Sequence, residues 1–202
     1  MSIRRTSHGR VPFAGAATIL AGIATLLVVV GVGTGVYALV GALLGNDEVA
    51  VHQTVAGDHV ERLPASVLPP SSVDVTIRIR DASREQRLLA AGRDAVVIVP
   101  LVTIMWLARG LFRSVPDGDP FTAVNVRRLR GIGFLCLLGL PAVSLLTTAF
   151  EDALAATTST GTILDTPFGI SEAGPLVGLG VFALAEVFAR GVRLRDDVEG
   201  TI

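Results

Sequence analysis

The sequence contains no lysine, because all 17 of its basic residues are arginines. Charged residues of any kind make up only 17% of the chain, whereas half of its residues are hydrophobic. A soluble domain of 202 residues seldom has this composition. The absence of lysine fits the codon bias of a GC-rich genome better than a selected use of guanidinium chemistry. The net charge of −1 favours no particular partner.

The sequence has a single cysteine, Cys136, which makes an intramolecular disulfide impossible. Because it lies inside an apolar block, we expect its thiol to be inert. Local motifs suggest no catalytic set of the Ser/His/Asp or Cys/His type. His52 and His59, with Asp58 and Glu61 nearby, lack the tight and repeated spacing of zinc ligands, so we interpret them as part of a solvated loop. We therefore expect no metal, no cofactor and no enzymatic activity.

Four apolar stretches of the sequence are each long enough to cross a bilayer, which requires about 20 helical residues. The first, from Val11 to Leu44, is uncharged and far longer than the apolar part of a signal peptide, so we interpret it as a retained span. The predicted fold class is all-α transmembrane, a four-helix membrane bundle forming a single domain over residues 1–202. The expected spans cover about residues 13–44, 90–112, 131–150 and 174–190.

The polar loop at residues 46–83 has the pattern of a small β element. In residues 73–81, valine and isoleucine alternate with polar residues, which is typical of a half-buried strand. Residues 48–55 are rich in valine and predict a second short strand. Because an isolated pair of strands is marginally stable, we expect this extracytoplasmic element to pack on the spanning helices.

Three local patterns predict where helices begin or bend. Ser83 followed by Gln86 fits a capping box and predicts a helix start. Thr122 is a suitable N-cap for a helix that begins near Ala123 and continues into the third span. Pro141 lies inside that span, where we expect it to kink the helix.

Two features of the apolar blocks bear on contacts between spans. Gly31 and Gly35 are four residues apart, which either permits close helix approach or reflects the abundance of glycine in this chain. Arg109 and Glu186 lie near the same end of their spans and could pair across helices, fixing the packing rather than moving an ion. Because the middle of every span is uncharged, a small transporter or channel component is the alternative function and not the leading one.

The distribution of arginine predicts the orientation of the chain. The N-terminal segment, residues 113–130 and the C-terminal segment each carry at least three arginines, whereas the loop at residues 151–174 carries none. Short basic segments stay in the cytoplasm. We therefore expect a multi-pass protein of the inner (plasma) membrane with both termini cytoplasmic. Residues 113–130, here called the hub, are expected on the same side.

The hub contains the densest cluster of positive charge in the chain, Arg127, Arg128 and Arg130. Three interpretations stay open: an anchor that fixes orientation, contact with anionic lipid head groups, and docking of a cytosolic partner. Residues 117–120, which precede the cluster, have the composition of a turn. Such a turn would place Phe121 at the membrane interface. The candidate residues for contact with a partner or lipid are Asp119, Phe121, Asn125, Arg127, Arg128 and Arg130.

The run Gly118-Asp119-Pro120-Phe121, then Asn125, then Arg128-Leu129-Arg130 before an apolar span, resembles the bacterial domain-of-unknown-function 2975 family of small four-span membrane proteins. The resemblance extends over most of the chain in the order of spans and loops. Family members are often encoded beside a small helix-turn-helix regulator. The resemblance therefore implies a sensor or regulatory partner in the lipid bilayer, with a cytosolic regulator of that kind as its partner. It assigns no catalytic residue, we expect no direct contact with nucleic acid, and a homo-oligomer is left open.

Overall fold

The computed structural model describes residues 14–45, 48–56, 72–116, 120–158 and 173–199. Within them, four helices are long and apolar enough to span a membrane, and a small two-stranded sheet lies in the first loop. The predicted fold class is thereby confirmed. The elements in chain order are α1 (Ala14–Leu44), β1 (Glu48–Ala56), β2 (Ser72–Arg80), α2 (Arg84–Ser114), α3 (Ala123–Phe134), the π-helical segment η2 (Leu135–Gly139), α4 (Leu140–Ala156) and α5 (Ala173–Glu199).

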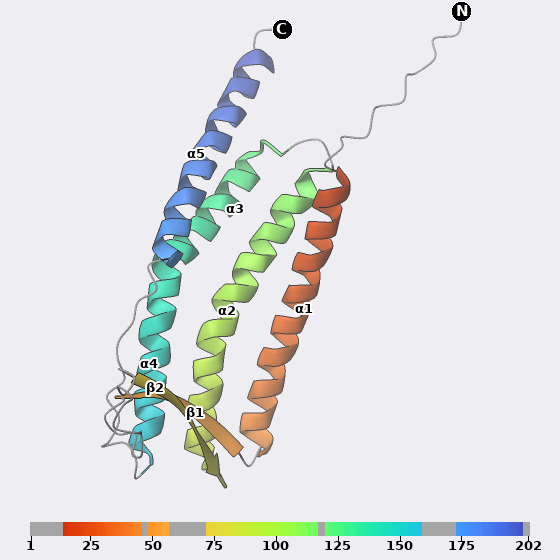
Figure 1. Cartoon of the computed structure of the whole chain (residues 1–202). Helices are drawn as coiled ribbons and strands as arrows, with labels where there is room; N and C mark the ends of the chain where they lie inside the picture. Colours follow the sequence, from red (N-terminus) through yellow and green to blue (C-terminus); the bar gives the residue numbers. More distant parts are fainter. Residues whose placement is uncertain (1–13, 46–47, 57–71, 117–119, 159–172, 200–202) are drawn as a thin grey trace, which may run out of the picture.

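Figure 1 shows how these elements are arranged. Helix α1 packs along α2, α2 packs on α3 and α4, and α5 packs chiefly on α3 and η2. The start of α1, the end of α2, the start of α3 and the end of α5 point toward one end of the bundle, which we call the hub end. The two strands lie at the opposite end, beside the start of α2 and the end of α4, and we call this the strand end.

The two strands pair antiparallel and close the strand end of the bundle. Val49 lies opposite Ile79, and Val51 lies opposite Ile77. Both valines are buried together with Leu154 of α4, and both isoleucines pack against this cluster. The polar side chains at positions 76, 78 and 80 are exposed. The predicted alternation is therefore confirmed for the part of β2 whose side chains are described.

Both predicted helix starts are confirmed in detail. The Ser83 hydroxyl accepts a hydrogen bond from the backbone N–H of Gln86, and the Gln86 side chain accepts one from the backbone N–H of Ser83. This capping box starts α2. The hydroxyl of Thr122 accepts from the backbone N–H of Asn125 at 3.2 Å and caps α3. Each cap satisfies backbone N–H groups that have no partner inside the helix.

The third spanning helix accommodates Pro141 by a change of helix type. Proline has no N–H to donate to the carbonyl of Leu137 four residues earlier, and its ring crowds that carbonyl. The chain forms the π-helical segment η2 immediately before α4, and Pro141 lies in the first turn of α4. The distortion expected at this proline is thus a locally widened turn between α3 and α4.

Glycines on α1 allow it to lie close to α2. A Cβ atom added at Gly31 would come within 2.5 Å of the Val102 side chain, and one added at Gly35 would lie 3.7 Å from Ile98. Both partners belong to α2, so the pair of glycines four residues apart faces the neighbouring helix. Of the two interpretations left open by the sequence, the structure supports close helix approach.

The contact of α5 with η2 brings Gly178 against backbone atoms. A Cβ atom added at Gly178 would lie 2.7 Å from the backbone nitrogen of Leu137 and 2.9 Å from the carbonyl oxygen of Gly133. Because these are backbone atoms, no side-chain movement could relieve the clash. Glycine at this position therefore sets the distance between α5 and the third spanning helix.

Large apolar side chains remain exposed along the outer surfaces of the helices. A soluble protein seldom exposes so much contiguous apolar surface, whereas lipid covers it in a membrane. Examples from α1, α2, α4 and α5 are Leu26, Val29, Val99, Leu101, Leu145, Leu176 and Leu179.

Helix α5 is longer than the expected fourth span. It continues to Glu199, beyond residue 190 where the span was expected to end. This extension contains no proline, and glycine occurs in it only at Gly191, so nothing in its sequence stops the helix. The extension lies at the hub end of the bundle (Figure 1).

Candidate functional site, an arginine groove between α3 and α5

Asn125, in the first turn of α3, is fully buried, with 0% of its surface exposed. Its Nδ2 donates hydrogen bonds to the Ser114 hydroxyl (2.6 Å) and to the carbonyl oxygen of Pro120 (2.9 Å). Its Oδ1 accepts a hydrogen bond of 2.8 Å from Nη1 of Arg128. These bonds connect the end of α2, the segment before α3 and the first turns of α3. Asn125 thereby fixes the direction in which the chain re-enters the bundle.

Arg128 lies against the backbone of α2. Its Nη1 donates a hydrogen bond of 2.8 Å to the carbonyl oxygen of Gly110. A Cβ atom on Gly110 would come within 2.7 Å of the guanidinium carbon, so a larger residue would push the guanidinium away. Arg128 therefore holds α3 against α2 and does not extend into the outward positive surface of the hub.

Phe121 connects the hub to α5. Its ring centroid lies 5.0 Å from that of Phe188, with the rings tilted by 39°, a separation at which aromatic pairs attract. A Cβ atom added at Gly191 would lie 2.7 Å from the Phe121 ring, so the absence of a side chain there makes room for the phenyl group. This contact fixes the C-terminal part of α5 beside the start of α3.

Between α3 and α5 a groove of about 320 Å³ opens at the hub end. Its lining combines small apolar side chains with three arginines, and both helices contribute to each kind. We call it the arginine groove. It is lined by Ala123, Val126, Arg127, Arg130, Ala189, Val192 and Arg193.

A single carboxylate, Glu186 of α5, is shared by three arginines at this site. Its oxygens lie 3.6 Å from Nη2 of Arg130, 3.9 Å from Nε of Arg190 and 3.4 Å from Nη2 of Arg193. Arg127, also exposed at the groove, forms no ion pair with a described residue. These five side chains therefore carry four positive charges and one negative charge, an excess that attracts anions.

The arrangement is suited to bind anions and not metal ions. Guanidinium groups have only donors, and their forked N–H groups match carboxylate and phosphate oxygens. Glu186 already occupies this kind of environment within the protein. Among the described residues there is no cluster of three or more His, Cys, Asp or Glu side chains that could hold a metal. The side chains of His52 and His59 lie outside the described part of the chain.

The predicted contact residues of the hub fall into two groups. Two of them, Arg127 and Arg130, line the arginine groove. Three others make the internal contacts set out above, and Asp119 lies outside the described residues. Contact of this set with a partner or with lipid stays a prediction. The members with internal contacts are Phe121, Asn125 and Arg128.

Sequence reasoning did not associate the C-terminal helix with this site. Glu186, Arg190 and Arg193 are spaced at i, i+4 and i+7, which places them on one face of α5. That spacing could have indicated a charged face. It could not indicate which other helix that face meets.

The pair expected between Arg109 and Glu186 is wrong. Nε of Arg109 donates a hydrogen bond of 2.8 Å to the Thr25 hydroxyl of α1, and the guanidinium carbon lies 5.1 Å from the centre of the Trp106 ring. Glu186 instead pairs with the three arginines of α3 and α5. Arg109 thus contacts α1 and Glu186 contacts α3. Helices α1 and α5 flank opposite sides of α2 and α3 (Figure 1).

Four long apolar helices with a lipid-suited surface define a multi-pass membrane protein. Comparison with known families gives a more specific result. The family model described as "Protein of unknown function (DUF2975)" matches residues 85–202, more than half of the chain, so the chain belongs to this family. The match begins in the first turn of α2 and includes every residue of the arginine groove. The resemblance stated from the hub sequence is thereby confirmed.

No curated protein and no solved structure matches the chain. The family is itself uncharacterised, so membership brings no activity, substrate or partner with it. Any function must be argued from the residues of this chain.

Proposed function

We propose that this protein is a regulatory membrane partner, and that the arginine groove binds an acidic segment of a cytosolic protein. The observation that carries the proposal is the excess of positive charge around the groove. Arg127, Arg130, Arg190 and Arg193 converge there, and Glu186 is the one carboxylate paired with three of them. The apolar lining between the arginines offers a surface for the aliphatic part of a bound segment.

Glu186 supports the choice of a carboxylate ligand. Its oxygens form ion pairs with guanidinium groups of both α3 and α5 at distances of 3.4–3.9 Å. These distances are long for charge-assisted hydrogen bonds, which are about 2.7–2.9 Å. One carboxylate is thus shared by three guanidinium groups, and some of their N–H donors remain available for a second carboxylate. An Asp or Glu side chain of a partner would meet these donors.

We propose that the hub end faces the cytoplasm. This rests on the positive-inside rule, because the basic residues near the hub end are not balanced by nearby acidic residues to the extent seen in the first loop. With the hub end in the cytoplasm, the arginine groove is within reach of cytosolic proteins. As the family resemblance implies, we propose a small helix-turn-helix regulator as the partner. The regulator, and not this chain, would contact DNA.

We also propose that the protein acts without catalysis. The chemistry offered at the groove is recognition of an anion by guanidinium donors, with no nucleophile beside it. A transporter or channel component stays the alternative. It is supported less well, because residues 95–108 of α2 and 131–150 of the third spanning helix carry no charged side chain.

Peptide binding tests the proposal. The full-length protein would be placed in nanodiscs of phosphatidylcholine, whose head group adds no net charge. It would then be titrated with a fluorescein-labelled helical peptide carrying four glutamates on one face, and anisotropy would be recorded. We expect saturable binding by the wild type. Changing Arg127, Arg130 and Arg193 together to Lys keeps the charge but removes the fork, so binding should weaken about tenfold.

Two controls make the result specific. The same Arg→Lys change at Arg78, Arg80 and Arg84, which lie at the strand end, should leave binding unchanged. Glu186→Gln removes the internal competitor and should tighten binding. Equal binding of a peptide with glutamine in place of glutamate, or full binding by the groove Lys variant, would refute the proposal.

A further inference from the structure

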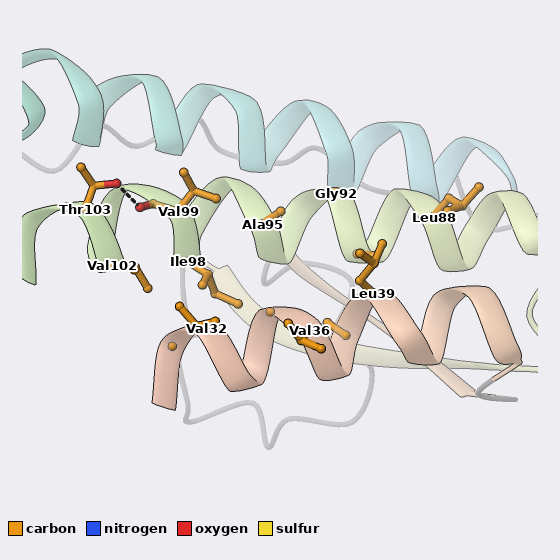
Figure 2. A pocket seen from close by; sticks show the side chains of 14 residues that line it. Val32, Val36, Leu39, Leu88, Gly92, Ala95, Ile98, Val99, Val102 and Thr103 are labelled. Atoms are coloured by element: carbon orange, nitrogen blue, oxygen red, sulfur yellow. Dashed lines mark hydrogen bonds between the residues drawn. The ribbon is translucent and has the colours of Figure 1, made fainter. Parts of the chain in front are cut away.

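An apolar groove of about 570 Å³ runs along the contact between α1 and α2 (Figure 2). Ile98 and Val102 of α2 point toward α1 within it (Figure 2). From Leu88 to Val102 the groove follows about 21 Å of helix at 1.5 Å per residue, which exceeds half of a hydrocarbon core of about 30 Å. It is therefore long enough to hold an acyl chain from one leaflet. The small residues in its lining are Gly31, Gly35, Ala38, Ala91, Gly92 and Ala95.

At the strand end the apolar groove joins a polar chamber of about 290 Å³. The two spaces share Ala38 and Ala91 in their linings, so they are adjacent. The chamber lies between α1, β1 and α2, where the helices reach the end of the bundle. A molecule that filled both spaces would need a polar head and an apolar tail. The polar residues that line the chamber are Thr34, Tyr37, Glu48, Arg87, Arg93 and Asp94.

Arg93 is largely enclosed, with 14% of its side chain exposed. It donates to the carbonyl oxygen of Ala50 (2.9 Å) and lies 3.0 Å from Asp94 and 3.9 Å from Glu151. Arg93 thus ties β1, α2 and α4 together. Its positive charge is already paired with carboxylates of the protein.

Arg87 and Asp94 can each form a further polar interaction in the chamber. Arg87 donates from Nε to the carbonyl oxygen of Ala42 (3.3 Å) and from Nη1 to that of Ala82 (2.8 Å). No described carboxylate forms an ion pair with it. Asp94 meets Arg93 through Oδ1 alone, and its Oδ2 has no partner in the described part of the chain. The chamber therefore presents one cation and one carboxylate oxygen that are available to a ligand.

We propose that this composite site binds a phospholipid whose head group carries both a phosphate and a primary ammonium group. The ammonium would donate to Asp94, the phosphate would lie at Arg87, and one acyl chain would fill the groove between α1 and α2. The charges lining the chamber, Glu48 and Asp94 against Arg87 and Arg93, cancel. Such a balance suits a zwitterion and not an anionic lipid.

The head group is selected by hydrogen bonding as well as by charge. A carboxylate accepts hydrogen bonds from a primary ammonium, whereas a choline group has no N–H to donate. Phosphatidylcholine would therefore leave Oδ2 of Asp94 without a hydrogen-bond donor. Phosphatidylglycerol would add a negative charge beside Glu48 and Asp94. Phosphatidylethanolamine has both the ammonium donor that Asp94 requires and the phosphate that pairs with Arg87.

A second hollow gives an internal comparison. It lies between α2 and α4, has a volume of about 420 Å³, and its described lining carries no charged side chain. Lipid tails can occupy it, but nothing in its lining distinguishes one head group from another. Selectivity is thus expected of the α1–α2 site alone. The lining residues of this hollow include Pro100, Gly139, Ala142 and Leu146.

Native mass spectrometry of the full-length protein in detergent tests the proposal. Phosphatidylethanolamine, phosphatidylcholine and phosphatidylglycerol with identical acyl chains would be added in turn, and the bound fraction measured. We expect the wild type to bind phosphatidylethanolamine about tenfold more tightly than the other two, the size expected of one charge-assisted hydrogen bond.

Matched variants locate the selectivity. Asp94→Asn should remove the preference for phosphatidylethanolamine, while Arg93 keeps Ala50 and Glu151 to hold the fold. Asp94→Glu keeps a carboxylate and should retain the preference. Ala91→Leu, at the junction of chamber and groove, should reduce binding of all three lipids. Ala142→Leu, in the hollow between α2 and α4, should leave the preference intact.

Thermal unfolding of each variant would confirm that it is folded. Equal affinity of the folded wild type for the three lipids would overturn the proposal. So would a folded Asp94→Asn variant that still prefers phosphatidylethanolamine over phosphatidylcholine.

Discussion

Nη1 of Arg128 donates hydrogen bonds of 2.8 Å to both the carbonyl oxygen of Gly110 on α2 and Oδ1 of Asn125 on α3. One of the three clustered arginines of the hub is therefore a structural tie between two spanning helices. Its neighbours Arg127 and Arg130 are exposed and line the arginine groove instead. The hub cluster thus combines two tasks that its sequence alone does not separate.

Removal of the Asn125 amide should destabilise the hub end. In Asn125→Ala, Ser114 and Arg128 lose hydrogen-bond partners inside the protein, and a cavity replaces the amide. We expect the free energy of unfolding in detergent to fall by about 3 kcal/mol. Arg127→Ala is the matched control, because that exposed side chain makes no hydrogen bond to a described residue. Equal stability of the two variants would show that the buried network contributes nothing.

The close contact of α5 with η2 predicts a contrast between two glycines of α5. Gly178→Ala should lower the free energy of unfolding by about 2–3 kcal/mol, because the added methyl group meets the backbone of Leu137 and Gly133. Gly180→Ala should be neutral or stabilise by up to about 1 kcal/mol, since no described atom lies within 4 Å of its added Cβ. SDS-induced unfolding in mixed micelles would measure both. If Gly180→Ala were the more damaging change, the packing of α5 described here would be incorrect.

The sequence predicted those features that depend on neighbouring residues. The capping box of Ser83 and Gln86 and the N-cap at Thr122 are determined within four residues, and both are formed. The alternation in β2 likewise follows from the two-residue period of a strand, and the side chains of Ile77 and Arg78 point to opposite faces.

The strand register makes its own prediction. Ile77→Asp places a charge against the cluster of Val49, Val51 and Leu154, and should destabilise the protein by about 2–4 kcal/mol. Arg78→Gln removes only an exposed pair with Glu48 at 3.8 Å and should change stability by less than about 1 kcal/mol. Thermal unfolding would compare them. A large loss in the Arg78 variant with none in the Ile77 variant would reverse the assigned faces.

The candidate site was only partly predictable, because it depends on contacts between residues far apart in the chain. Arg127 and Arg130 were identified from their charge, but Glu186 and Arg193 reach them only because α5 packs on α3. That packing depends on Gly178 meeting backbone atoms of the third spanning helix, a relationship with no local signature. Asn125 was predicted as a possible contact for a partner or lipid, and its burial follows from the turn that returns α3 to α2.

The proposed orientation predicts that both termini lie in the cytoplasm. An alkaline phosphatase domain fused after Arg195 should be inactive, and a green fluorescent protein domain at the same position should fluoresce. Phosphatase inserted between β1 and β2 should be active, because that loop is expected outside. An active phosphatase after Arg195 would place the arginine groove on the wrong side for a cytosolic partner.

Photo-crosslinking in the native membrane tests the central claim most directly. A benzophenone side chain would be placed at Val192, inside the arginine groove, or at Leu194, exposed on α5 outside its lining. The account predicts that Val192 alone yields an adduct with a soluble protein, through a peptide rich in Asp and Glu. That adduct should be lost when Arg127, Arg130 and Arg193 are changed to Lys. An adduct formed equally from both positions, or one that survives the Lys changes, would contradict docking in the arginine groove.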